Sequence, residues 1–252
     1  MTYRNFKLPH LHPPGATYSI LLCVADAVPK AMLKKVSLER STKLAQARRA
    51  GGQATSAHIR QIQSTYDELF NEILRKHANQ EHPLADPGAA AIMVEKLKKY
   101  DGELYDLYSY SVLSNHVHAE LDFSVQLPNG LDEGVLPDNY KPLSETVRLI
   151  KGGSSFEINR LLGRKKPLWP KRYRDRFIRG ENHLMAACRY TLNNPVTAGL
   201  VKHHSDHTFT GGMTIDQIAD RQSRRIYPNP AAYYAQLEAY DIENPSRNED
   251  FS

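Results

Sequence analysis

Cysteine and long apolar runs are scarce in this chain of 252 residues. Its two cysteines, Cys23 and Cys188, are too few for a disulfide framework and lack the paired spacing of a zinc knuckle. No apolar run approaches the roughly 20 residues that a membrane-spanning helix needs, and no apolar signal-peptide core follows the first residues. The sequence therefore predicts a protein of the reducing cytoplasm without a membrane anchor.

Positive charge is in moderate excess and is unevenly distributed. The formal net charge is +5. The segment from Arg160 to Arg179 contains nine Lys or Arg residues and one acidic residue. Trp169, Tyr173 and Phe177 are interleaved with them. Because basic side chains neutralise phosphates and aromatic rings stack on bases, this stretch predicts binding of single-stranded or distorted nucleic acid. The candidate DNA contacts are Lys151, Arg164, Lys165, Lys166, Lys171, Arg172, Arg174 and Arg176.

Apolar periodicity predicts an α+β fold. The strands expected are a central one at 16–25, a pair within 104–124 and an edge strand at 171–178. The helices expected are 29–50, 58–77, 89–100 with a cap at Asp86-Pro87, 144–162, 181–193 stopped by Pro195, and short ones near 215–221 and 231–240. This order favours a small antiparallel sheet with helices on one face, followed by a polar end from 244 to 252.

Two histidines mark the strand pair. Since successive side chains of a strand point to opposite faces, His116 and His118 project the same way and form a bidentate site for a divalent cation. Two imidazoles do not complete a coordination shell, so a third donor is expected elsewhere. Glu120 lies on the same face and is one candidate.

The helix expected at 181–193 carries a tyrosine away from its apolar face. Leu184, Cys188 and Leu192 mark that face, whereas Tyr190 shares its stripe with His183 and Asn194. A histidine pair, a tyrosine with an amide, and a basic aromatic stretch are the parts needed for phosphodiester cleavage by a tyrosine. His183 is a candidate for assisting proton transfer, and the alternative, which the sequence favours, is a solvated histidine on the helix surface.

Four segments, taken in order, resemble the REP-associated tyrosine transposases, which are single-tyrosine HUH transposases of bacterial insertion sequences. They are Asn-His-Val-His at 115–118, the helix start at 143–152, the basic aromatic stretch at 168–179, and the tyrosine segment at 190–201 with its Asn-Pro-Val-Thr-Ala-Gly-Leu-Val ending. The paired histidines alone are weakly specific, but the ordered set is strongly so. The resemblance covers roughly residues 14–203.

The resemblance implies a ferredoxin-like four-stranded antiparallel sheet with the histidines on a central strand and the tyrosine on the last helix. It implies a transposase domain over residues 1–205, with a helical insertion at about 30–100, and a partly helical extension at 206–252. It implies that Tyr190 cleaves single-stranded DNA beside palindromic, REP-like hairpins and keeps a 5′-phosphotyrosine link. It also implies Mg²⁺ or Mn²⁺ held by His116, His118 and, where related enzymes place a glutamine, Asn194.

Three questions stay open at the level of sequence. A domesticated protein that binds DNA hairpins without cleaving them would carry the same basic stretch. A zinc hydrolase of a small substrate, with Glu120 as third ligand, would carry the same histidine pair. Tyr190 would serve its own histidines in a monomer or those of a partner subunit in a homodimer.

Overall fold

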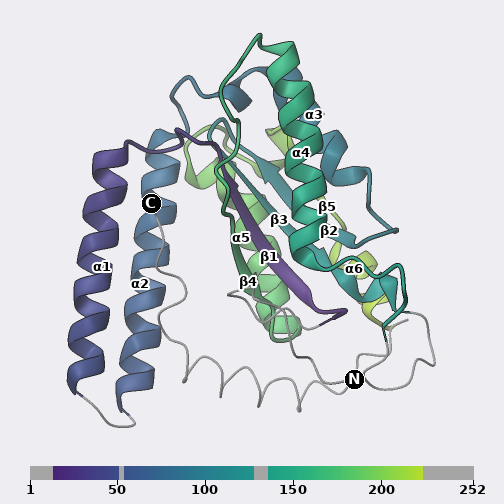
Figure 1. Cartoon of the computed structure of the whole chain (residues 1–252). Helices are drawn as coiled ribbons and strands as arrows, with labels where there is room; N and C mark the ends of the chain where they lie inside the picture. Colours follow the sequence, from purple (N-terminus) through teal and green to yellow (C-terminus); the bar gives the residue numbers. More distant parts are fainter. Residues whose placement is uncertain (1–13, 51–53, 128–135, 224–252) are drawn as a thin grey trace. The chain divides into compact units, whose positions relative to one another are not determined.

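The computed structural model of the protein describes residues 14–50, 54–127 and 136–223 (Figure 1). The described residues form two compact units, one of residues 28–72 and one of residues 14–27 and 73–223. None of the helices in the described ranges combines the length and the apolarity that crossing a membrane requires. The expected helix near 231–240 and the polar end at 244–252 lie outside the described residues.

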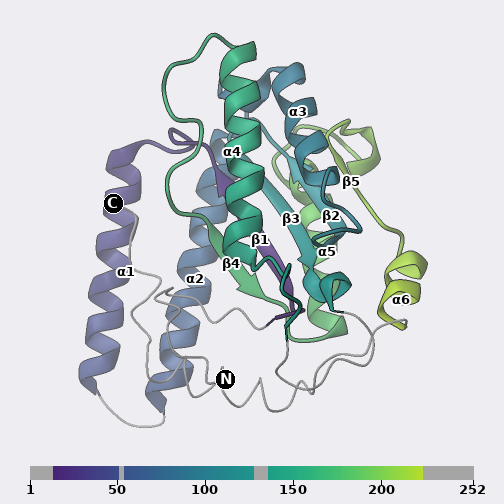
Figure 2. The same ribbon diagram turned by 45° about the vertical axis from the view of Figure 1, so that its right-hand side comes forward.

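The first unit is a pair of antiparallel helices. They are α1 (Lys30–Ala50) and α2 (Ala54–His77), which lie side by side in Figures 1 and 2. The Lys43 ammonium lies 5.6 Å from the centre of the Tyr66 ring, a cation–π contact between the two helices. Both helices were expected from the sequence, and the second begins four residues earlier than predicted. The last turn of α2, from Ile73, belongs to the second unit.

The second unit is built on one antiparallel sheet of five strands in the order β4-β1-β3-β2-β5. The strands are β1 (Thr17–Cys23), β2 (Asp106–Val112), β3 (His116–Asp122), β4 (Arg174–Phe177) and β5 (Thr210–Gly212). The central position of β1 and the edge position of β4 agree with the sequence predictions.

The expected number of four strands is wrong, because β5 adds a fifth beside β2. Its residues are Thr-Gly-Gly and show no alternation of apolar and polar side chains, so pattern alone does not reveal it. A Cβ atom on Gly212 would lie 2.5 Å from the Tyr108 carbonyl oxygen. The strand therefore pairs so closely that only glycine fits there.

Helices cover both faces of the sheet. Figures 1 and 2 show α3 (Pro87–Lys98) and α4 (Leu143–Leu161) on one face and α5 (Glu181–Thr197) on the other. The predicted placement of helices on a single face is therefore wrong. All residues of β2 and β3 are buried, which is the burial expected for strands covered on both sides.

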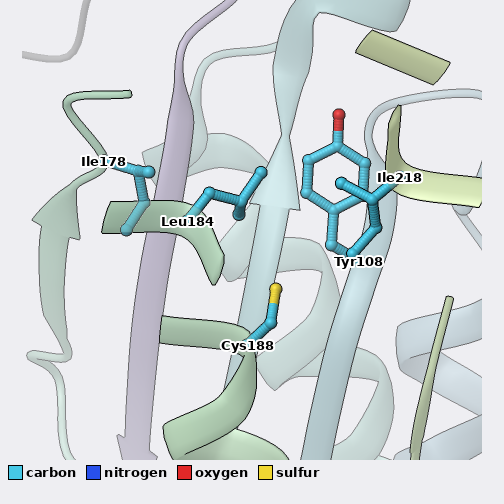
Figure 3. Packing of buried hydrophobic residues seen from close by; sticks show 5 residues of the cluster. All are labelled: Tyr108, Ile178, Leu184, Cys188 and Ile218. Carbon is cyan, nitrogen blue, oxygen red and sulfur yellow. The ribbon is translucent and has the colours of Figure 1, made fainter. Parts of the chain in front are cut away.

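An apolar cluster fixes α5 against the sheet. Figure 3 shows Leu184 and Cys188 of α5 meeting Tyr108 of β2, Ile178 after β4 and Ile218 of α6 (Ile215–Ser223). Leu184 and Cys188 are two of the three residues predicted to mark the apolar face, and the third, Leu192, is partly buried outside this cluster. The helix α6 was expected and lies in the part of the chain predicted as the extension at 206–252.

The predicted start of α3 agrees with the structure, but the predicted end of α5 does not. Asp86 caps α3 as predicted, since its Oδ1 accepts the Ala89 N–H at 2.9 Å and Pro87 occupies the first turn. The predicted stop before Pro195 is wrong, because α5 continues through Pro195 to Thr197. Asn194 is therefore part of the helix and lies one turn after Tyr190. Gly199, with φ of 72°, follows the helix end.

Three short 3₁₀ turns complete the second unit. They are η1 (Pro83–Ala85), η2 (Phe123–Gln126) and η3 (His204–Asp206). The first of them lies beside the loop that precedes the histidine pair, since the Leu84 N–H donates to the Ser114 carbonyl oxygen at 3.1 Å.

Candidate active site

The two histidines lie on the middle strand of the sheet and face α5. Their ring centres are 5.2 Å apart, and both side chains are buried. In the β1–β3 register, His118 is opposite Leu21 and His116 is opposite Cys23. Both imidazoles thus sit near the end of β1, on one face, as the spacing of two residues predicts.

Asn115 fixes the tautomer of His116. The Asn115 amide nitrogen donates to the carbonyl oxygens of Ala27 at 3.2 Å and Leu74 at 2.9 Å, which leaves its Oδ1 to meet His116 Nδ1 at 2.7 Å. An amide oxygen only accepts, so Nδ1 carries the proton. The Nε2 lone pair of His116 therefore points into the site, as it does in metal-binding histidines.

Both imidazoles are held in the neutral form. Burial lowers the pKa of His118 to about 3, and the nearby Arg75 cation acts in the same direction. Burial also lowers the pKa of His116 well below its ordinary value, helped by His118 and Arg75. Neutral imidazole is the metal-binding form, so the pair is ready to bind a cation at neutral pH.

Tyr190 stands beside the histidines of its own chain. Its ring centre is 5.4 Å from that of His118 in an edge-on arrangement, and its side chain is 41% exposed. The hydroxyl accepts a hydrogen bond from Arg75 Nη1 at 3.0 Å. Burial raises the pKa of the Tyr190 phenol, and the positive charge and hydrogen bond of Arg75 oppose that rise. The candidate nucleophile is therefore partly exposed to solvent, and its phenol oxygen accepts a hydrogen bond from the Arg75 cation.

Asn194 lies one helical turn after Tyr190 and closes the site from α5. Its Nδ2 lies 2.9 Å from His116 Nε2, and its Oδ1 is buried without a hydrogen-bond partner. Rotating the amide by 180° exchanges the two atoms and turns the oxygen to the position next to Nε2. Two imidazole nitrogens and an amide oxygen suit a hard divalent cation, so the residues present fit Mg²⁺ or Mn²⁺.

Glu120 shares the histidine face but its carboxylate is otherwise engaged. It accepts hydrogen bonds from Ser19 Oγ at 3.1 Å, from Thr191 Oγ1 at 2.9 Å and from Ser109 Oγ. Across the described ranges, no three His, Cys, Asp or Glu side chains come together in a group that would hold a metal ion. The contacts of Glu120 instead tie α5 to three strands directly beside Tyr190.

Two of the predicted DNA contacts share the face of the histidines. Arg174 is opposite Leu21, and Arg176 is opposite Ser19, so both arginines stand on the same side of the sheet as His118 and Glu120. The charge of Arg176 also acts on the Tyr190 phenol, where it lowers the pKa. The edge strand β4 therefore adds positive charge beside the tyrosine.

The other predicted contacts lie along α4 and the segment after it. Lys151 Nζ donates to the carbonyl oxygens of Pro170, Lys171 and Arg172 at 2.7, 3.0 and 3.4 Å, so this lysine holds the chain that follows. Arg164 is partly buried. The exposed members of the set are Lys165, Lys166, Lys171 and Arg172.

His183 lies apart from the tyrosine hydroxyl, near the start of α5. Its Nδ1 accepts the Arg179 N–H at 3.2 Å, a local contact at the helix start. The Tyr190 hydroxyl is instead bonded to Arg75. These contacts give no support to a role of His183 in proton transfer, which was the less favoured reading of the sequence.

Sequence reasoning missed Arg75, which lies 115 residues before Tyr190. It belongs to an exposed stripe of a long helix, where no spacing singles it out. The roles of Ser19, Ser109 and Thr191 were also missed, because each is an ordinary hydroxyl on an apolar element. Asn115 had a signal, since it directly precedes the histidine pair.

Comparison with known proteins gives one structural likeness. No family model and no curated protein matches this chain. A solved structure described as the REP-associated tyrosine transposase bound to a REP hairpin is similar, at 16% sequence identity and a TM-score of 0.44. The match covers 90% of this chain and 88% of that one. At these values the likeness alone establishes neither a family nor an activity.

Proposed function

We propose that the protein is a metal-dependent single-stranded DNA endonuclease and strand transferase, in which Tyr190 is the nucleophile. The observation that carries the proposal is the cluster of Tyr190, His118, His116 and Asn194 on facing elements of one unit, with the phenol edge-on to His118. In this arrangement the tyrosine would act on a phosphate held by the histidines of its own chain.

The phenol oxygen forms the new bond to phosphorus, and the bond from phosphorus to the 3′ oxygen of the preceding nucleotide breaks. The phenol proton passes to water, to which the Tyr190 side chain is 41% exposed. The departing oxygen takes a proton from water and becomes a free 3′-hydroxyl. One phosphodiester replaces another, so a second 3′-hydroxyl reverses the step and joins strands without an external energy source.

His116, His118 and Asn194 would hold the Mg²⁺ or Mn²⁺ ion. When bound, such an ion polarises the scissile phosphate and stabilises the charge that develops on it. Asn115 keeps His116 in the tautomer that this role requires. Arg75 orients the phenol and favours its ionised form.

Arg174 and Arg176 would position the strand by its phosphates on the histidine face. DNA beside a palindromic hairpin is the substrate that suits this arrangement, since a hairpin offers a single strand and a rigid duplex together. Lys165 and Lys166, which are exposed after α4, would contact the duplex phosphates.

The test is a covalent adduct. A labelled single-stranded hairpin oligonucleotide, incubated with the protein and Mn²⁺, should give a band that survives denaturing electrophoresis. Tyr190→Phe should give no adduct and keep DNA binding, and a chelator should have the same effect as this substitution. Tyr100→Phe is the matched control, because it removes a partly exposed phenol from the same unit outside the cluster.

Two outcomes would refute the proposal. An adduct of equal yield with Tyr190→Phe would mean that another residue is the nucleophile. Tight hairpin binding with no cleavage under any divalent metal, unchanged by His116→Ala and His118→Ala, would mean that the protein is the non-catalytic hairpin binder.

A further inference from the structure

A groove runs between one face of α4 and the basic aromatic segment that precedes β4. Its volume is about 350 Å³. On the α4 side its lining residues follow the helical repeat, and the facing wall carries two aromatic rings, Trp169 and Tyr173. The volume is that of a site for one small organic group, and the lining combines apolar, aromatic and cationic side chains.

The wall of the groove is held rigidly. Trp169 Nε1 donates to Ser154 Oγ at 3.0 Å, and Lys151 Nζ binds the carbonyl oxygens of residues 170 to 172. Lys151 also lies 5.9 Å from the centre of the Tyr173 ring. The groove is therefore formed before any ligand arrives, which lowers the entropic cost of binding.

Gly152 opens the helix side of the groove. A glycine inside a helix is unfavourable relative to alanine, and a Cβ atom on Gly152 would have no heavy atom within 4 Å. Crowding therefore does not explain this glycine. Gly153 differs, because its Cβ would meet the Lys96 side chain at 3.6 Å and point away from the groove. The Gly152 position is therefore open space on the groove lining.

The groove lies on the α4 face of the sheet and the histidines face α5, but the groove wall and the histidine loop are tied together by the backbone that follows β1. The Val24 N–H donates to the carbonyl oxygen of Asn115, which precedes His116, and the Ala25 N–H donates to that of Leu168, which precedes Trp169, both at 2.9 Å. Two consecutive residues that directly follow β1 thus tie the backbone before the histidine pair to the backbone before Trp169.

We propose that this groove holds one unpaired nucleotide of the DNA strand, with its base against the half-buried Tyr173, beside Trp169, which is buried in the groove wall. The cations at the mouth, Arg148 and Lys171, are both exposed and would face its phosphates. An aromatic wall with cations beside it favours a stacked base over a duplex, whose bases are already stacked. The inference rests on the proposed function for its substrate class and adds a nucleotide site apart from the cleaved phosphate.

The single tryptophan of the chain makes the groove observable, since Trp169 alone produces the tryptophan fluorescence. Short single-stranded oligodeoxynucleotides, titrated with a chelator present, should quench this emission in a saturable way. Blunt duplexes of the same sequence should not. Gly152→Met, which fills the open space, should weaken the single-strand affinity by about tenfold, the change that the loss of one base stack produces.

Gly153→Ala is the matched control, because it also replaces a glycine inside α4 but leaves the groove open. Both variants should unfold at the parental temperature or above it. Equal quenching by duplex and single strand, or equal affinities of the two glycine variants, would overturn the inference.

The two proposals fail separately. Tyr190→Phe should keep the quenching in full and lose the adduct. An adduct without specific quenching would refute the groove site alone, and quenching without any adduct would refute the cleavage proposal alone.

Discussion

Glu120→Gln should stabilise the protein at alkaline pH. The carboxyl is fully buried beside the histidines, and burial raises its pKa from 4.5 to about 7, against the hydrogen bonds from Ser109, Thr191 and Ser19 that lower it. Because the folded state binds its proton more tightly than the unfolded state, the group stabilises the fold less and less as the pH rises from 4.5 through 7. Glutamine has nearly the same shape and no charge.

The magnitude follows from the pKa. At about 1.4 kcal/mol per pH unit, keeping the ionised carboxylate in the folded protein costs about 3 kcal/mol. The variant should therefore match the parent in its free energy of unfolding near pH 4.5. It should exceed the parent by up to about 3 kcal/mol above pH 7, reduced by whatever weakening the amide brings to the three hydroxyl bonds.

Urea unfolding of both proteins across this pH range is the assay. Glu103→Gln, which removes an exposed carboxylate of the same unit, is the control and should keep the parental pH profile. A difference between parent and Glu120→Gln that does not change with pH would refute the reasoning. The same variant should keep the parental affinity for Mn²⁺, since the Glu120 oxygens bind hydroxyl groups; a clear loss of affinity would make Glu120 a ligand.

Three further substitutions test the contacts of the site. Arg75→Met removes the hydrogen bond to the phenol, so adduct formation should slow by about tenfold at neutral pH and its pH profile should shift upward; an unchanged profile would contradict this role. Thr191→Val should cost about 1–3 kcal/mol of stability in urea unfolding, because it breaks the buried bond to Glu120, whereas Thr197→Val, whose hydroxyl is exposed, should cost much less. Asn194→Ala should weaken Mn²⁺ binding in calorimetry by about tenfold or more, and Asn193→Ala, its exposed neighbour, should not.

Elements with a strong local pattern were predictable from the sequence. The histidine strand, the Asp86 cap and the apolar face of α5 each follow from residues close together in the chain, and the structure has all three. The strand β5 was not predictable, since its pairing depends on the close approach of Gly212 to β2 rather than on its own pattern. The continuation of α5 through Pro195 likewise depends on more than the local preference of the residue before a proline.

The candidate site divides in the same way. His116 and His118 were named from their spacing, and Tyr190 and Asn194 from their shared helix stripe together with the resemblance. The fold brings the four side chains together. Arg75 and the hydroxyls around Glu120 come from elements far away in the chain, so only tertiary packing connects them with the site. For Glu120, the two-residue repeat of a strand correctly predicts the face of the sheet on which the side chain lies. It does not predict the hydroxyl groups that bind the carboxylate oxygens.

The most direct test of the account is to find which side chain carries the DNA. The covalent adduct formed with a hairpin oligonucleotide and Mn²⁺ is digested with protease and nuclease, and the modified peptide is sequenced by mass spectrometry. The account predicts a 5′-phosphate linked to the oxygen of Tyr190. A nucleotide linked to any other residue would contradict it.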